Sequence, residues 1–420
     1  NYYDCDDVDR TEPVVADAIN GSSSGTGTLT NPFDSLQDAI DNANECVVAY
    51  QGTYTESIDL SGKSLDVWGV DGWDVTTIDA NLSTCGITNP TACAAAVTVA
   101  DNVNATPVIH GFTITGGTGK YTSSSSSTTC ADSSASHTGR TTCTVYTYEY
   151  CGGGVYAYGD DPEFYDVVIR DNTLPVFEQT GYGSWTQYWM YSSGGGVCLN
   201  SSNASFSDVT IEGNYADQGG GIYAEGGSRF TFEAGYIADN EATDGGGVNL
   251  SGASATMSNA IIDCNSADTD GGGIYTESSG SSTFTNMVFF YNTSSTSGTA
   301  RGADAYVGAS TTLNMYNSIV ENSTTVYLIY GGGGTGTHQY DNVYNATSSE
   351  YGGTLSAGTG SISASSNFAS ANCDGNPYND DFSLRSTSSS VNAGNSSSSY
   401  NDTDGSRNDM GAYGGPAGSW

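Results

Sequence analysis

Apolar and polar residues alternate in short runs along most of this chain, and glycine or asparagine residues separate the runs. Val209-Thr210-Ile211 and Gly273-Ile274-Tyr275-Thr276 both have the two-residue period of a strand with one buried face. Residues 36–43 differ, because their apolar positions follow a helical period. The pattern predicts many short strands and one short amphipathic helix near the start of the chain.

A glycine triplet followed by Val or Ile recurs through the middle of the chain. The triplets begin at Gly152, Gly194, Gly219, Gly245 and Gly271, at spacings of 42, 25, 26 and 26 residues. Such a period holds two or three short strands with tight corners, but not a strand followed by a full helix. The residues after the triplets are expected to form one internal column: Val155, Val197, Ile222, Val248 and Ile274. Their successors should point outward: Tyr156, Cys198, Tyr223, Asn249 and Tyr275.

A second marker, an apolar residue followed three positions later by Asn, keeps step with the glycine triplets. Glycine permits a positive φ at one corner, and Asn tolerates the left-handed region at the other. An Asn amide can also bond the equivalent Asn of the next coil. We therefore predict an all-β fold, a single right-handed parallel β-helix solenoid with capped ends and two inserted loops. Its corner ladder would comprise Asn172, Asn214, Asn240, Asn265, Asn292 and Asn322.

The repeat divides the chain into three regions. Residues 1–46 are predicted to form an N-terminal cap, 47–334 the β-helix coils, and 335–420 the last coils and a C-terminal cap that folds back over the last coil. Insertions at 118–150 and 173–193 leave after the second marker and return at a glycine triplet. They should therefore emerge from the same corner of consecutive coils and lie side by side.

These markers resemble the repeats of polymorphic outer-membrane proteins and, more broadly, the pectin-lyase-like right-handed β-helix superfamily. Gly52-Thr53-Tyr54-Thr55-Glu56 is similar to the first coil of secreted bacterial β-helix proteins, and the stretch from Ser390 to Tyr413 resembles their closing segment. The resemblance covers nearly the whole chain. It implies a β-helix, surface exposure and commonly an adhesive or structural role, but no single reaction, because this fold carries many activities.

The charge balance restricts the partners. Asp and Glu number 47 against 9 Lys and Arg, so the net charge is −38. Such a surface repels nucleic acid and anionic membranes and suits cations such as Ca²⁺. The sequence predicts no transmembrane segment, and it shows no signal peptide at its start. A secreted protein would have this chain as its mature form.

The cysteines indicate an oxidising compartment. There are ten, an even number, with no Cys-x-x-Cys pair, which favours disulfides over a metal site. Two pairs would each close a short loop, and a third pair joins the N-terminal region. The expected disulfides are Cys85–Cys93, Cys130–Cys143 and Cys5–Cys46.

Candidate catalytic groups are few. A lyase would need a Lys or Arg base, but these residues are rare and do not occupy equivalent repeat positions. Asp160 and Asp161 are adjacent carboxylates suited to acid–base work, although a Gly-Asp-Asp-Pro sequence also fits a solvated turn. Asp402, Asp404 and Asp409 resemble part of a Ca²⁺ loop around a glycine turn, without the later bidentate Glu. The sequence requires no cofactor, and Ca²⁺ is the ion that these carboxylates suggest.

The second insertion is rich in aromatic residues. Such side chains suit protein interfaces, stack on sugar rings, or simply cover the flank of the solenoid. The residues are Phe177, Tyr182, Trp185, Tyr188, Trp189 and Tyr191.

Three functions remain open. The preferred hypothesis is a non-enzymatic extracellular structural or adhesive protein that self-associates into a filament or surface layer. The first alternative is a secreted polysaccharide lyase or hydrolase. The second is an adhesin that binds surface glycans or a host.

Overall fold

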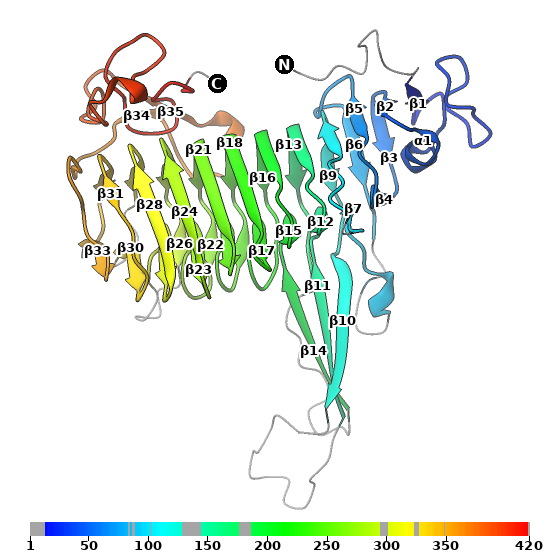
Figure 1. The fold of residues 1–420 in the computed structure, drawn as a ribbon, viewed down its shortest axis with the longest axis horizontal. Helices are drawn as coiled ribbons and strands as arrows, with labels where there is room; N and C mark the ends of the chain where they lie inside the picture. Colours follow the sequence, from blue (N-terminus) through cyan, green and yellow to red (C-terminus); the bar gives the residue numbers. More distant parts are fainter. Residues whose placement is uncertain are drawn as a thin grey trace, which may run out of the picture.

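The computed structural model describes residues 13–82, 85, 89–101, 103–127, 144–175, 186–294, 301–322, 327–347 and 349–418. These residues wind into an elongated stack of β-coils, with a narrow arm projecting from one side (Figure 1). Strands of successive coils pair in parallel. The prediction of an all-β parallel solenoid is confirmed.

One long sheet takes a single short strand from each coil. Its register places Val97, Val155, Val197, Ile222 and Val248 in one file that continues through Ile274 to Ala305, and all of these side chains are fully buried. The predicted internal column is therefore confirmed. The strands are β4 Ile58–Asp59, β7 Val97–Val99, β12 Val155–Tyr158, β15 Val197–Asn200, β17 Ile222–Glu225, β20 Val248–Ser251, β23 Ile274–Glu277, β27 Ala305–Gly308, β30 Tyr327–Gly332 and β33 Ser349–Gly353.

The neighbours of this column face away from it, but they are not all exposed. Cys198 and Asn249 are fully buried, and Tyr223 is 7% exposed. Cys198 and Tyr223 belong to a separate small cluster outside the main core, together with Cys151. The expectation that these side chains face outward holds, but other parts of the chain cover several of them.

The second long sheet supplies the remaining two faces of each coil. Asp166, Asp208, Ala234 and Asn259 have positive φ values and bend four of its strands in the middle. The N-terminal strands are β1 Val14–Ala16, β2 Cys46–Ala49, β3 Gly52–Tyr54, β5 Asp66–Gly69, β6 Thr76–Asp79, β8 Val108–His110 and β9 Thr113–Thr115. The later ones are β13 Glu163–Arg170, β16 Ser205–Glu212, β18 Arg229–Ala238, β21 Ser254–Asp263, β24 Gly280–Thr285, β25 Val288–Phe290, β28 Thr311–Tyr316, β29 Ile319–Glu321, β31 His338–Gln339 and β32 Asn342–Tyr344.

One small sheet and three short turns complete the secondary structure of the described residues. A short parallel sheet lies at the asparagine corner and consists of β19 Glu241–Ala242, β22 Ser266–Ala267 and β26 Thr293–Ser294. Single 3-10 turns are η1 Pro90–Ala92, η2 Pro377–Asn379 and η3 Ser398–Tyr400. No helix in the described part of the chain is long and apolar enough to cross a membrane.

The glycine corner is needed for steric reasons. Gly194 has φ 67°, and a Cβ there would lie 2.2 Å from the carbonyl oxygen of Val197. A larger residue would have to displace backbone at this corner.

The asparagine ladder is continuous over five coils. The Nδ2 of Asn172 donates to Oδ1 of Asn214 at 3.0 Å, and the same bond repeats from Asn214 to Asn240, from Asn240 to Asn265 and from Asn265 to Asn292. Each of these acceptor oxygens also receives the backbone N–H of the preceding Asn. All five side chains are at most 1% exposed, so the ladder satisfies polar groups that burial would otherwise leave unpaired.

Two details of the ladder differ from the expectation. The left-handed conformation belongs to the residue before each Asn, for example Asp171 at φ 57° and Asp239 at φ 53°. The last rung is also different, because Asn292 Nδ2 donates to Oδ1 of Asp304 at 2.9 Å. Asn322 joins through Asp304 and through the backbone oxygen of Asn292. A buried carboxylate thus interrupts the amide chain.

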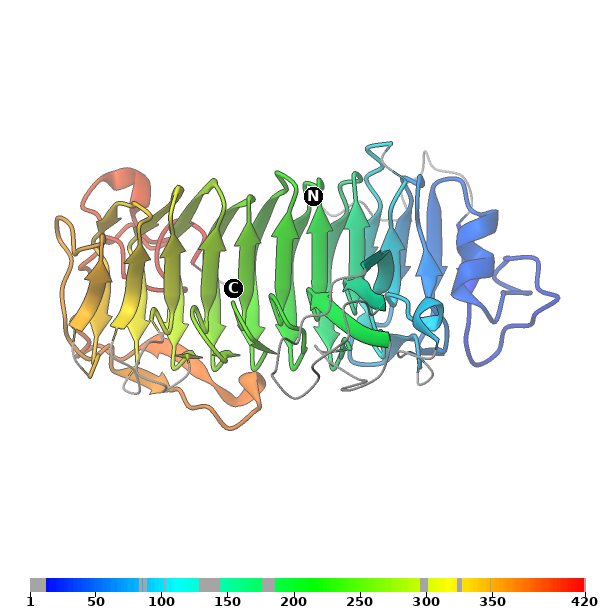
Figure 2. The same cartoon turned by 90° about the horizontal axis from the view of Figure 1, so that it is seen from below.

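The predicted helix covers the N-terminal end of the stack. It is α1 Leu36–Asn42, and it buries Leu36, Ala39 and Ile40 against the first coils (Figure 2). Glu56 accepts hydrogen bonds from the backbone N–H groups of Leu36 and Gln37, where the helix dipole favours a negative charge. This arrangement agrees with an N-terminal cap.

The C-terminal region has two parts, one that packs on the last coil and one that runs along the side of the stack. Leu355 joins the core at the last coil, as a cap would. Beyond residue 367 the chain instead runs back beside the coils, seen in orange and red in Figures 1 and 2, and includes β34 Phe368–Ser370 and β35 Asp381–Leu384. We call residues 368–418 the tail. Its described part lies along the flank, which corrects the expectation that it caps the last coil.

Candidate functional site

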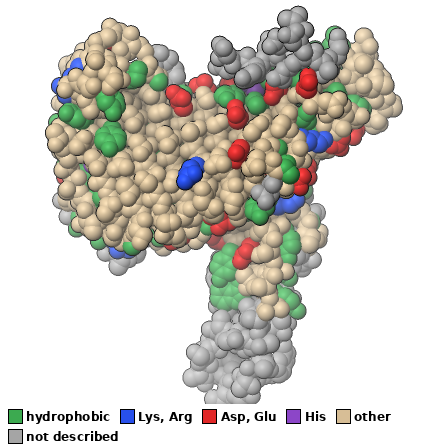
Figure 3. All heavy atoms as spheres, viewed as in Figure 1, with side chains coloured by type: hydrophobic (Ala, Val, Ile, Leu, Met, Phe, Trp, Pro, Cys, Tyr) green, Lys and Arg blue, Asp and Glu red, His purple; other side chains and the backbone are tan. Residues whose placement is uncertain are grey.

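The two insertions form the arm. β10 Lys120–Ser127 pairs antiparallel with β11 Thr144–Cys151, and β11 pairs in parallel with β14 Thr186–Ser193. The insertions thus lie side by side, as predicted, and their described parts form strands. Figure 3 shows hydrophobic side chains gathered on the arm just below the coils.

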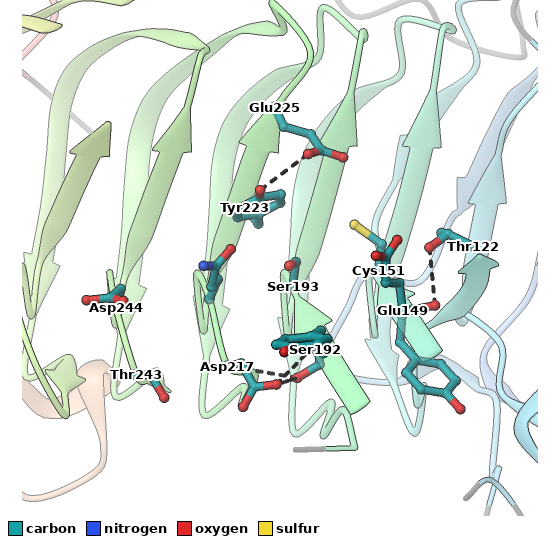
Figure 4. A pocket seen from close by; sticks show the side chains of 13 residues that line it. Thr122, Glu149, Cys151, Ser192, Ser193, Asp217, Tyr223, Glu225, Thr243 and Asp244 are labelled. Atoms are coloured by element: carbon teal, nitrogen blue, oxygen red, sulfur yellow. Dashed lines mark hydrogen bonds between the residues drawn. The ribbon is translucent and has the colours of Figure 1, made fainter. Parts of the chain in front are cut away.

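A cavity of about 590 Å³ lies where the root of the arm meets the outer face of the sheet that contains β17 (Figure 4). We call it the arm–coil cavity. Its lining combines carboxylates, tyrosines and small polar groups. The carboxylates are Glu149, Asp217, Glu225 and Asp244, the tyrosines are Tyr150, Tyr191 and Tyr223, and the other residues are Thr122, Cys151, Ser192, Ser193, Gln218 and Thr243.

Hydrogen bonds hold two of these carboxylates in place. The backbone N–H and the hydroxyl of Ser192 both donate to Oδ2 of Asp217, at 3.0 and 3.1 Å, which ties the arm to the coil. Glu225 Oε1 accepts from Asn200 Nδ2 at 2.7 Å, and its Oε2 accepts from the Tyr223 hydroxyl at 3.3 Å. The arrangement presents fixed acceptors to a ligand.

The charge of the cavity is one-sided. No Lys or Arg is among the described residues that line it. Burial raises the pKa of Asp244 above its ordinary value, and the neighbouring Asp270 and Asp268 add to the rise, while a Thr269 hydrogen bond opposes it. Burial and the nearby Glu225 also raise the pKa of Tyr223. The cavity therefore suits a ligand without negative charge.

The predicted aromatic residues are only partly described. Tyr191 lines the cavity and is 47% exposed, and Trp189 lies on the same strand, β14. Tyr188 also belongs to β14, and Phe177, Tyr182 and Trp185 lie outside the described residues. Sequence reasoning found Tyr191 but missed the acidic lining, because its residues come from separate coils and from the arm.

Disulfides reinforce the arm and the tail. The predicted Cys85–Cys93 bond is present, and Cys46 is disulfide-bonded, whereas Cys5, Cys130 and Cys143 lie outside the described residues. Two further bonds, Cys151–Cys198 and Cys264–Cys373, were not predicted. The sequence did contain a signal for the Cys151–Cys198 bond. Cys198 follows Val197 of the internal column, and Cys151 directly precedes the glycine triplet of the coil before it.

Asp160 and Asp161 do not act as a pair. The Asp160 carboxylate is fully buried and accepts backbone N–H groups from Asp101, Val103 and Ala105 at 2.9 to 3.0 Å, so it anchors a loop. Desolvation would raise its pKa, but these hydrogen bonds hold the pKa below its ordinary value.

Asp161 faces elsewhere. Its Oδ1 accepts from the backbone N–H of Asn203 at 2.7 Å. Together with Glu163 and Arg229, it lines a second, larger hollow of about 820 Å³ on the outer face of β16, β18 and β21. Most of the remaining lining is Ser and Thr.

The predicted Ca²⁺ loop closes on itself. Asp402 accepts backbone N–H groups from Asp409 and Gly415, and Asp404 accepts the Ser406 hydroxyl and N–H. Burial and the two nearby carboxylates raise the pKa of Asp409. Within the described residues, no three Asp, Glu, His or Cys side chains are already arranged to hold a metal.

Comparisons with known proteins agree with the fold. The family model described as right handed beta helix region matches residues 151–369. No curated protein matches the chain significantly.

Several solved structures are similar. Pectate lyase Pel9A has 15% identity and a TM-score of 0.45, over 95% of this chain and 96% of its own. Pectin methylesterase from carrot has 12% identity and a TM-score of 0.33, over 77% of this chain and 84% of its own. Lacto-N-biosidase from Eubacterium ramulus has 10% identity and a TM-score of 0.33, over 83% of this chain and 67% of its own. At these values the likeness concerns the fold alone and carries no argument about activity.

Proposed function

The chain belongs to the right-handed β-helix family, and from that scaffold we propose that it is an extracellular protein that binds a neutral polysaccharide in the arm–coil cavity. The observation that carries the proposal is the cavity lining, which joins exposed tyrosine and fixed carboxylates without a described Lys or Arg. Disulfides such as Cys151–Cys198 support an extracellular location, because they persist in oxidising compartments.

The lining matches the chemistry of a sugar. Tyrosine offers a flat apolar face with a polar edge, which suits the C–H face and the hydroxyls of a pyranose ring. Carboxylates accept hydrogen bonds from sugar hydroxyls, and such charge-assisted bonds contribute about 1.5–3 kcal/mol each. A volume of about 590 Å³ lies within the usual range of ligand sites. An anionic polysaccharide would instead meet four carboxylates of like charge.

The adhesive hypothesis fits this cavity better than the filament hypothesis does. End-to-end stacking of copies needs open coils at both ends, but α1 packs on the first coils. A glycan-binding adhesin requires only the side of the solenoid, where the cavity lies. We therefore favour glycan binding over self-assembly.

Hydrolysis of the bound chain is a second candidate, because Asp244 lines the cavity together with Asp217 and Glu225, and burial raises its pKa. A carboxyl that keeps its proton can act as the general acid, and Asp217 or Glu225 would then serve as the base that activates water. Asp244→Asn should abolish release of reducing ends and reduce binding far less. Unchanged release would eliminate this candidate.

The binding proposal is tested by titration calorimetry. Neutral oligosaccharides of glucose, mannose and xylose are compared with oligogalacturonate as the anionic counterpart. At least one neutral series should bind, and oligogalacturonate should not. Glu225→Gln should weaken binding about tenfold or more, and Tyr191→Ala about fivefold, because each loses one main contact.

Tyr158→Ala provides the matched control. Tyr158 is 40% exposed on β12 of the same sheet but does not line the cavity. Its loss should leave the affinity unchanged. Equal affinities for wild type, Tyr191→Ala and Glu225→Gln would refute the proposed site, and a failure of every neutral glycan to bind would refute the proposed function.

A further inference from the structure

Five carboxylates gather where the tail crosses the ends of β16, β18 and β21. Three come from successive coils and two from the tail. Cys264–Cys373 and the hydrogen bond from the Tyr378 hydroxyl to Glu212, at 3.2 Å, hold the two layers together here. We call the group the tail-side acidic cluster: Glu212, Asp239, Asp263, Asp374 and Asp380.

Asp263 is the central member of this cluster. It is 2% exposed on the outer face of β21, in register with Phe290, beneath the tail. Its Oδ1 has no hydrogen-bond partner within the described structure. The disulfide sulfur of Cys264 lies 3.7 Å from its Oδ2 and has no proton to donate. A carboxyl group buried in this way either keeps its proton or takes a positive partner, such as a cation, to offset the desolvation of its charge.

Neighbouring carboxylates make a negative charge on Asp263 still less favourable. Burial is the largest cause that raises the pKa of Asp263, and Asp239, Asp380 and Glu212 raise it further. Asp374 acts in the same direction on Asp239 and Asp380. Within the described residues, the one cation in an ion pair with the cluster is Arg170, whose Nη1 lies 3.8 Å from Glu212 Oε1 at its edge.

We propose that the tail-side acidic cluster binds a divalent cation of the Ca²⁺ class, which fastens the tail to the coils. Ca²⁺ takes six to eight oxygen ligands in flexible geometry and accepts several carboxylates at once. Asp263, Asp239 and Asp380 supply the central oxygens. In the described structure, no three of these carboxylates are arranged closely enough to hold a metal ion. Binding therefore draws the loop at residues 372–380 towards the coils, and the disulfide keeps that loop close.

The experiment titrates the folded protein with Ca²⁺, with Tb³⁺ as a luminescent substitute that nearby Tyr378 and Tyr236 can sensitise. Asp263→Asn removes the central charge, and Asp239→Asn is a second variant at a half-buried position in case the first does not fold. Asp404→Asn is the matched control, because Asp404 lies on the same tail in the exposed loop. Proteolysis of the tail is followed with Ca²⁺ and with EDTA.

Wild type and Asp404→Asn should bind Ca²⁺ alike, and EDTA should increase tail cleavage in both at least severalfold. Either cluster variant should lose this site, show no Tb³⁺ emission above background, and have a tail that is equally sensitive with and without Ca²⁺. Retained Ca²⁺ binding in a folded cluster variant would overturn the proposal. So would a wild-type protein that binds no Ca²⁺ at millimolar concentration, or that loses its binding in Asp404→Asn.

Discussion

The arm and the tail are both attached to the same coils, but they meet them in different ways. The tail buries Phe382 and Met410 against Ile261, Val288 and other apolar residues on the outer face of the coils. The arm has a smaller apolar cluster, in which Tyr150 and Met190 pack with Leu174 and Ala216. The polar contact of Ser192 with Asp217 also ties it to the coils, and the arm–coil cavity stays open beside it. An apolar seam stabilises the fold, whereas an open polar cavity is left available for a ligand.

The largest effect should come from the apolar seam. Phe382 is 1% exposed, and Phe382→Ala should cost about 3–5 kcal/mol in the free energy of unfolding of the tail, because it leaves a cavity that the seam cannot refill. Urea unfolding and proteolysis of the tail both measure this loss. If the variant keeps the wild-type protection, the tail is not held by its apolar contacts.

A medium effect on the free energy of unfolding should come from Asp304, which ends the amide chain of the corner ladder. Burial raises the pKa of Asp304 to about 7, although hydrogen bonds from Asn292 and Asn322 oppose the rise. The folded state then keeps this proton where the unfolded state has lost it. Stability is therefore full below about pH 4 and falls by about 1.4 kcal/mol per pH unit up to about pH 7.

Asp304→Asn should remove the contribution of Asp304 and so reduce the slope, to which other buried carboxyl groups such as Asp263 also contribute. It should be more stable than wild type at pH 8. The measurement is urea unfolding at pH 5 and pH 8, with the exposed carboxylate variant Asp34→Asn as a control that keeps the slope. Glycan binding and tail protection should not change. A slope in Asp304→Asn equal to that of wild type would show that Asp304 does not contribute to it.

The smallest effect on stability should come from the cavity. Tyr191→Ala removes a ring that is 47% exposed, so the free energy of unfolding should change by less than about 0.5 kcal/mol. Thermal unfolding followed by circular dichroism measures it. A loss as large as that of Phe382→Ala would mean that the arm is a structural brace rather than the wall of a binding site.

The coils were predictable because each carries its own signals. The glycine triplets and the second marker located the internal column and the ladder from Asn172 to Asn292. Asp304 was missed because Gly302-Ala303-Asp304 stands where the earlier coils have a glycine triplet. Only the folded structure places its carboxylate at the asparagine corner. The left-handed conformation was expected at each ladder Asn but belongs to the residue before it. That residue is Asp, Cys or Tyr in different coils, so the sequence shows no common pattern there.

The tail seam also left a signal that was overlooked. Apolar and polar residues alternate in Val209-Thr210-Ile211, as expected for a strand with one solvent-exposed face. Ile261-Ile262 and Val288-Phe289-Phe290 are instead continuously apolar. A continuous run indicates burial on both faces. The partner that covers such a strand could not be predicted, because the contacts join residues more than 100 positions apart, as in Cys264–Cys373.

The cavity was the least predictable part. Its carboxylates belong to the arm and to two coils, and no single sequence window contains them. Spacing alone could not show that Asp217, Glu225 and Asp244 line the same space, because the arm that encloses them enters from an insertion.

The most direct test is a crystal structure of the protein with the neutral oligosaccharide that binds best in calorimetry. The account predicts sugar density in the arm–coil cavity, with a pyranose ring against Tyr191 or Tyr223 and hydroxyls on Glu225 and Asp217. Density instead in the hollow beside Arg229, with the arm–coil cavity empty, would contradict it.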